Sequence, residues 1–285
     1  MKDITTRENK GLNGLTENRA IDHHNEEFFR TLLDDTFYCN IEGLEFERML
    51  DKENQLKGID LVGRLNGDKL VIDEKVQTSK AFVPEARKRS KFTYFRDGQE
   101  ITVKTACTPT FCFELMCSKM AKRQRETPQY NTYGFIVSTD VFGQKKYPGW
   151  FLDAKKETRQ YVCVWPHNLN EIEIMMIDRD DLLNVLKQKG LTDEKVETAL
   201  YDIQADAAEA IQRDNFKASK WKAPLRYFDD CLKNEKGEYD AWFTSSIYNL
   251  AEAPINLICR KEFLMSLPKT QHWMMFPRER KLMKI

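Results

Sequence analysis

The stretch that decides the fold is GIDLVGRLNGDKLVIDEKVQ, residues 58–77. Two short apolar runs in it are joined by Asn66-Gly67-Asp68, and an Asn-Gly pair between apolar runs is the strongest short-range signal for a β-hairpin. Side chains in a strand alternate between the two faces of a sheet, so Asp73 and Lys75, two positions apart, point to the same face. The sequence therefore predicts a hairpin that presents a carboxylate beside a lysine.

A second carboxylate is available from the other strand of this hairpin. Asp60 lies in the first strand and can converge with Asp73 and Lys75, whereas Glu74 points to the opposite face. Two carboxylates on neighbouring strands suit Mg²⁺ or Mn²⁺, which prefer oxygen ligands and substrate phosphates. A lysine beside the metal can orient or deprotonate the attacking water and stabilise charge on phosphorus, and Gln77, on the same face, is placed to position water or phosphate.

This arrangement resembles the PD-(D/E)xK nuclease superfamily, whose motif is an Asp, a spacer and then (Asp/Glu)-x-Lys on the next strand. The resemblance covers mainly the segment from Glu26 to about Lys80, with a looser match onward to about Leu186. It implies an α/β, restriction-endonuclease-like fold, in which a mixed central sheet is flanked by helices. It also implies a Mg²⁺- or Mn²⁺-dependent deoxyribonuclease that serves restriction, repair or defence against mobile DNA. The residues that carry it are Gly58-Ile59-Asp60, followed by Asp73-Glu74-Lys75 and Gln77.

An amphipathic helix is predicted before the hairpin, because apolar residues recur at helical spacing in DHHNEEFFRTLLDD, residues 22–35. Many members of the superfamily carry a metal-binding Glu on their first helix. Glu26 and Glu27 are both available here, and Glu27 is the favoured metal ligand beside Asp60 and Asp73. The alternative is that these aspartates are ordinary surface carboxylates and that Lys75 makes a surface ion pair. The apolar residues on both faces of the hairpin favour a partly buried site instead.

Two basic clusters are candidates for binding the DNA backbone, although a solvated charged face explains each of them about as well. The first is Arg87-Lys88-Arg89 with Lys91, and the second is Lys119 with Lys122, Arg123 and Arg125. Because the chain holds 45 basic and 45 acidic residues, any attraction to DNA must come from such local patches. A homodimer is left open.

Composition places few further limits on function. No apolar run approaches the length that spans a membrane, and the first residues lack a secretory signal, so we expect a cytoplasmic protein without membrane contact. The odd number of cysteines, seven, fits reduced thiols better than a disulfide framework.

Polar residues 1–20 are expected to form a flexible arm, and residues 21–190 the nuclease-like domain. Residues 191–285, rich in helix formers at their start, are expected to form a mainly helical region packed on that core.

Two further hypotheses compete with the nuclease. The first is a catalytically inactive nuclease-like fold that acts as a DNA- or protein-binding module. The intact set of Asp60, Asp73 and Lys75 argues against it, because an inactive fold tends to lose one of these residues. The second is an unrelated α/β protein with a chance motif. A separation of more than about 8 Å between Asp60 and Asp73 would favour that second hypothesis, because a shared metal needs short bonds to both.

Overall fold

The computed structural model describes residues 26–77, 90–105, 107–119, 146–199, 202, 225–245 and 252–285. The chain forms two compact units. The first combines Met1–Pro109, Lys156–Leu182 and Leu264–Ile285, and the second combines Thr110–Lys155 and Leu183–Phe263. None of the helices in these described ranges is long and apolar enough to cross a membrane.

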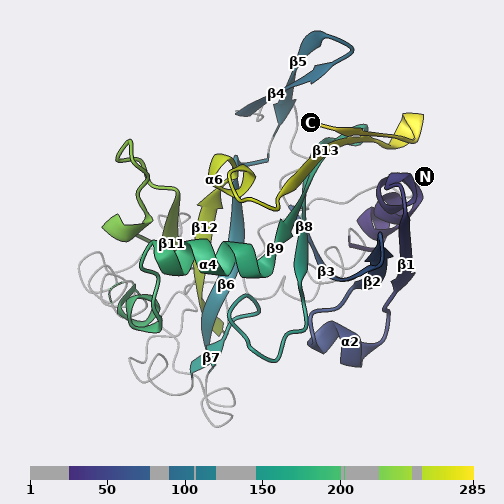
Figure 1. The fold of residues 1–285 in the computed structure, drawn as a ribbon. Helices are drawn as coiled ribbons and strands as arrows, with labels where there is room; N and C mark the ends of the chain where they lie inside the picture. Colours follow the sequence, from purple (N-terminus) through teal and green to yellow (C-terminus); the bar gives the residue numbers. More distant parts are fainter. Residues whose placement is uncertain are drawn as a thin grey trace, which may run out of the picture. The chain divides into compact units, whose positions relative to one another are not determined.

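A seven-stranded sheet forms the body of the first unit, and its strand order is β1-β2-β3-β8-β9-β13-β14 (Figure 1). Neighbouring strands run antiparallel except for β3 and β8, which run parallel. The sheet is therefore mixed and joins segments far apart in the chain. The strands are β1 (Leu44–Arg48), β2 (Leu61–Leu65), β3 (Asp68–Val76), β8 (Gln160–Asn168), β9 (Glu171–Asp178), β13 (Gln271–Phe276) and β14 (Lys281–Lys284).

One face of this sheet packs against the helical segment 26–40, which begins as an α-helix and continues through η2 (Leu33–Phe37) and η3 (Tyr38–Asn40). Its buried residues Phe29, Leu33 and Phe37 pack in one core with alternate strand residues such as Ile72 and Val164. This helix is the one predicted from the apolar spacing. Short helix α2 (Lys52–Leu56) connects β1 to β2, and the Asp51 side chain caps it by accepting a hydrogen bond from the backbone of Asn54 at 2.9 Å.

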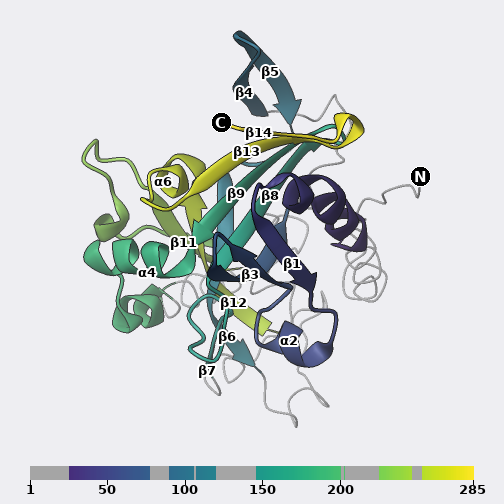
Figure 2. The same ribbon diagram turned by 45° about the vertical axis from the view of Figure 1, so that its right-hand side comes forward.

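A separate two-stranded ribbon, β4 (Ser90–Arg96) and β5 (Gln99–Thr105), also belongs to the first unit. Its buried Tyr94 packs with Met274 and Phe276 of β13. An isolated hairpin is marginally stable in water, so this apolar contact with the sheet is what supports the ribbon. Figure 2 shows the ribbon beyond β13 and β14.

The second unit contains an antiparallel five-stranded sheet of order β10-β11-β12-β6-β7. Its strands are β10 (Leu225–Tyr227), β11 (Ala241–Ser245), β12 (Glu252–Arg260), β6 (Thr110–Lys119) and β7 (Lys146–Pro148). Further short elements among the described residues are α4 (Arg179–Gln188), η7 (Asp230–Leu232), α6 (Lys261–Met265) and η8 (Pro277–Glu279).

The expected α/β, restriction-endonuclease-like architecture with flanking helices and a mainly helical C-terminal region is wrong. The described structure is dominated by strands, its helices are few and short, and residues 225–285 contribute five strands from β10 to β14. The physical reason is visible in β13, where QHWMMF is buried at every position after Gln271. A strand that is covered on both faces lacks the alternation of apolar and polar residues that identifies strands in a sequence.

Candidate active site

The predicted β-hairpin is formed by β2 and β3 and brings Asp60 beside β3. Asn66 and Gly67 both have positive φ, 52° and 93°, as the tight turn between two such strands requires. The pairing extends past the end of β2, because the backbone N–H of Asp60 donates to the carbonyl of Ile72 at 2.9 Å. The backbone of Asp60 is thereby bonded to the residue that precedes Asp73.

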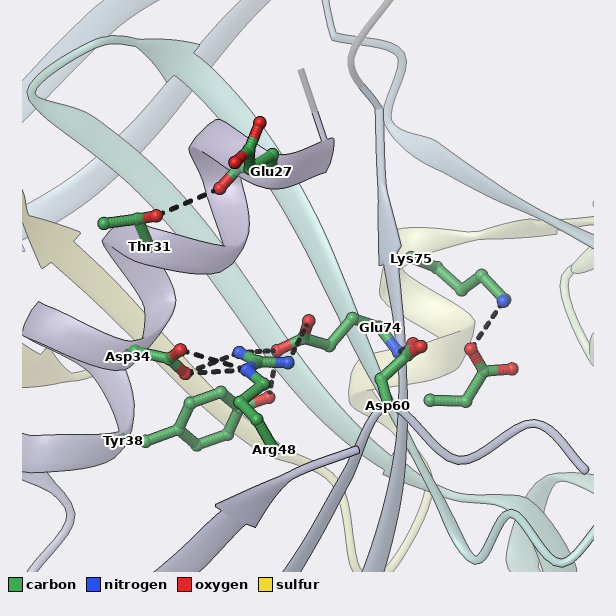
Figure 3. Close-up of polar contacts among 9 residues, drawn as sticks. Glu27, Thr31, Asp34, Tyr38, Arg48, Asp60, Glu74 and Lys75 are labelled. Carbon is green, nitrogen blue, oxygen red and sulfur yellow. Dashed lines mark hydrogen bonds and ion pairs between the residues drawn. The ribbon is translucent and has the colours of Figure 1, made fainter. Parts of the chain in front are cut away.

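Asp60, Asp73 and Lys75 come together as the sequence predicts. The Lys75 Nζ donates to Asp73 Oδ1 at 2.6 Å, and the backbone N–H of Glu74 donates to Asp60 Oδ2 at 2.8 Å (Figure 3). Asp73 is only 5% exposed, whereas the Lys75 side chain is 29% exposed. The site therefore places a largely buried cation on a buried carboxylate, next to a second carboxylate that the backbone holds.

Burial and charge set the protonation of this group. The pKa of Asp73 is raised to about 6, because burial and, to a smaller extent, the neighbouring charge of Asp60 outweigh the opposing charge of Lys75. Burial by itself would lower the pKa of Lys75, but the carboxylates of Asp73 and Asp60 outweigh it, so the net shift is upward. The lysine therefore stays protonated at neutral pH. Asp60 and Asp73 repel each other, and Lys75 is the one positive charge among the three motif residues.

The end of the hairpin is fixed by the segment that leads into β8. Thr158 Oγ1 donates to the carbonyl of Gly58 at 2.6 Å, and the backbone N–H of Arg159 donates to the carbonyl of Val71 at 2.9 Å. Gly58 has φ +72°, and a Cβ on it would lie 2.5 Å from Thr158 Oγ1 and 3.7 Å from Asp73 Oδ2. Only glycine fits this position without strain, so the backbone next to Asp73 is closely packed.

Tyr161 and Arg179 lie in the region of the site, although no motif in the sequence identifies them as site residues. Tyr161 of β8 is paired with Asp73 of β3 in the parallel ladder, and its side chain is fully buried. Burial raises the pKa of Tyr161, the cation of Arg179 lowers it, and the charge of Asp73 raises it. A phenol and a guanidinium therefore lie in the electrostatic neighbourhood of the carboxylates. Tyr161 stands within the apolar run QYVCVW, and its approach to Asp73 depends on a pairing between distant segments.

The opposite face of β3 carries a buried polar network (Figure 3). The Tyr38 hydroxyl donates to Glu74 Oε1 at 2.7 Å, and Arg48 donates to both Glu74 oxygens at 2.7 and 2.8 Å. Arg48 also donates to Asp34, with its shortest contact at 2.6 Å. Burial raises the pKa of Glu74, although its hydrogen bonds to Arg48 oppose this shift. Glu74 thus faces away from Lys75, and its side chain holds β3 against the helical segment while its backbone holds Asp60.

The remaining predicted site residues are Gln77, which follows β3, and the glutamates of the first helix. The backbone N–H of Gln77 donates to the carbonyl of Val164 at 3.1 Å and so continues the pairing of β3 with β8. Glu26 and Glu27 are exposed in the first turn of the helix, and Figure 3 shows the Glu27 carboxylate directed away from Asp60. Within the described ranges no three or more His, Cys, Asp or Glu side chains are grouped to hold a metal ion.

Two residues of the basic clusters lie in the described part of the chain, and one of them, Lys119, is the last residue of β6. Lys91 is an exposed residue of β4. The other six, Arg87, Lys88, Arg89, Lys122, Arg123 and Arg125, lie outside the described residues.

A second buried polar cluster joins three strands of the same sheet. Glu173 of β9 is fully buried, and its two oxygens lie 2.8 Å from Nε2 of His167 on β8 and 2.8 Å from Nε2 of His272 on β13. The sequence offers no spacing that relates these histidines to each other, and only the strand order brings them to one carboxylate. Because both ring atoms contact the carboxylate directly, the cluster links the strands by hydrogen bonds.

The chain matches no family of known proteins, no curated protein and no solved structure.

Proposed function

We propose that this protein is a metal-dependent deoxyribonuclease that hydrolyses phosphodiester bonds, with Asp60, Asp73 and Lys75 at its centre. The observation that carries the proposal is the 2.6 Å contact between Lys75 Nζ and the buried Asp73 carboxylate, with Asp60 beside them. A buried carboxylate with a pKa of about 6, next to a second carboxylate and a largely buried ammonium, is a feature of catalytic sites more than of surface ion pairs.

The donor set fits a Mg²⁺ or Mn²⁺ ion. Mg²⁺ is usually held by one or two carboxylates and keeps its other positions for water and substrate phosphate, and Asp60 and Asp73 would supply those carboxylates. Their mutual repulsion, part of what raises the pKa of Asp73 to about 6, is relieved by an added cation. When bound, the ion supplies Lewis-acid stabilisation of the phosphate and a more acidic water.

The protein's own residues then have separable tasks. Asp73 orients Lys75 through the 2.6 Å contact, and the backbone N–H of Glu74 orients Asp60. Because the pKa of Lys75 is raised, the lysine is better suited to stabilising negative charge on the phosphate and orienting water than to removing a proton. Gln77 is proposed to position water or phosphate on the same side of β3.

The wider setting follows from the same proposal. The substrate is DNA, bound with help from the two basic clusters, and the protein acts in the cytoplasm in restriction, repair or defence against mobile DNA. A homodimer is compatible with this role. Glu27 has no place in the proposed metal site, because its exposed carboxylate is directed away from Asp60.

The test incubates purified protein with linear and with circular DNA in Mg²⁺, Mn²⁺ or EDTA. We expect cleavage with metal only, and cleavage of circular DNA would identify internal cutting. Lys75→Ala should reduce the rate by more than about 100-fold. The matched control is Lys69→Ala, which removes an exposed lysine from the same strand and should cleave normally.

Two results would contradict the proposal. One is a wild-type rate in Lys75→Ala. The other is DNA binding without cleavage by the wild-type protein in either metal, which would support the binding-module alternative instead.

A further inference from the structure

The β4–β5 ribbon has two chemically distinct faces. Asp97 and Gly98 at its tip have φ of 53° and 77°, so a tight two-residue turn joins the strands and fixes their register. Side chains then alternate along each strand: Tyr94 is buried and Phe92 partly buried, while Thr93 between them is exposed. The ribbon therefore has an inner face that packs on the protein and an outer face that meets solvent.

The inner face is held by several different contacts within the first unit. The ring of Phe92 stacks on His167 with centroids 4.4 Å apart and planes 8° from parallel. The Tyr94 hydroxyl donates to Glu171 at 2.7 Å, and Arg96 pairs with Glu279. These contacts hold the ribbon in one orientation, so its outer face is a preformed surface.

The outer face concentrates residues that suit an anionic, aromatic ligand. Lys91 and Lys104 lie directly opposite each other in the register, and both are exposed. Like charges in that position are destabilising, and within the described part of the chain neither lysine makes an ion pair. The next exposed pair, Thr93 and Thr102, is joined through its hydroxyls at 2.8 Å, and Phe95 beyond it is 66% exposed.

We infer that this outer face binds single-stranded nucleic acid, with backbone phosphate at Lys91 and Lys104 and an unpaired base stacked on Phe95. The inference rests on the proposed function for the choice of nucleic acid, and it specifies a single-stranded stretch as the substrate. Lys91 and Phe95 are four residues apart, which is about 13 Å along a strand. An isolated phosphate cannot reach both, whereas a polynucleotide can.

The tip of the ribbon favours a base over a phosphate. Glu100 lies opposite Phe95 on the outer face, so its charge opposes a phosphate there while leaving the ring of Phe95 open to stacking. A base within a duplex already has neighbours on both of its faces. An unpaired base has a free face, and this difference selects a single strand.

Binding is measured by fluorescence anisotropy of labelled oligo-dT in EDTA, where no cleavage occurs, over a series of salt concentrations. The salt slope is the magnitude of the slope of log binding constant against log salt concentration. The double variant Lys91→Gln/Lys104→Gln should weaken binding and lower this salt slope by about 1.4, because each phosphate contact to a single strand contributes about 0.7. The matched control is Lys187→Gln/Lys236→Gln, which removes two other exposed lysines and should bind like the wild type.

Phe95→Leu separates stacking from general apolar contact. It should raise Kd about fivefold or more with no change in salt slope, because it removes the ring but keeps an apolar side chain. Oligo-U and a blunt duplex are the comparison ligands. We expect oligo-U to bind through the same residues and the duplex to bind more weakly, without dependence on Phe95.

Wild-type affinity and salt slope in the double variant, or wild-type affinity in Phe95→Leu, would overturn the inference. The proposed function fails independently of it. If oligo-dT binding depends on the ribbon but no metal supports cleavage, the surface stands and the nuclease assignment falls. If DNA is cleaved but the ribbon variants bind like the wild type, the nuclease assignment stands and the inference falls.

Discussion

Replacing Asp73 with Asn should make the metal-free protein more stable while it removes the proposed activity. Burial and the charge of Asp60 raise the pKa of Asp73 to about 6, against 3.8 for an ordinary aspartate. That difference corresponds to about 3 kcal/mol of unfolding free energy that the ionised carboxylate costs the folded state. Asn has nearly the same shape and no charge, so it removes this cost.

The raised pKa of Asp73 also determines how the stability gain of Asp73→Asn changes with pH. Between pH 3.8 and about pH 6 the folded state binds more protons at Asp73 than the unfolded state does, so the stability of the wild type falls as pH rises through that window. The gain from Asp73→Asn should therefore be complete above about pH 7, decrease as pH falls, and vanish below about pH 4. Asp68→Asn, the same change at an exposed position of β3, is the matched control.

The assay is urea unfolding in EDTA, followed by circular dichroism across this pH range. A destabilised Asp73→Asn protein at high pH would refute the reasoning, because it would mean that the ionised carboxylate is favourable where it lies. A gain that does not change with pH would also refute it, since the cause would then not be ionisation. Added Mg²⁺ should narrow the difference in unfolding free energy between the wild type and the variant, because it stabilises the wild type alone.

Three other changes test the surroundings of the site. Glu74→Ala should lower the unfolding free energy by about 3 kcal/mol, because it leaves the buried cation of Arg48 without this partner. It should nevertheless reduce Mn²⁺ affinity in calorimetry less than Asp60→Ala does, and a larger loss would mean that the side chain acts in the site. Gly58→Ala should cost more than about 1 kcal/mol in urea unfolding and slow cleavage, since its φ of +72° is strained for alanine; unchanged stability would contradict the packing described. Truncation after Gly190 removes β13 and β14 and should give insoluble or molten protein, whereas a soluble, cooperatively folding and active fragment would show that the region is separable.

The helical fold expected for the C-terminal region failed for a physical reason that applies beyond this chain. The helix-forming composition that begins after Leu191 suggested a mainly helical region, but composition describes only the local preference of a segment. Strand β13 pairs with β9 on one side and β14 on the other, and its contacts outweigh any local preference. Such pairing between distant segments leaves no periodic signal when both faces of the strand are buried.

The sequence by itself determined the β2–β3 hairpin and the face on which each of its charged residues lies. Both depend on local rules: an Asn-Gly turn sets the register, and strand alternation places Asp73 with Lys75 and Glu74 opposite them. Only the tertiary structure decided which residues surround that hairpin. The parallel pairing of β3 with β8 brings Tyr161 to Asp73, and the helical segment brings Tyr38 to Glu74. These partners come from distant parts of the chain, and their approach depends on the packing of the whole sheet, which no local pattern encodes.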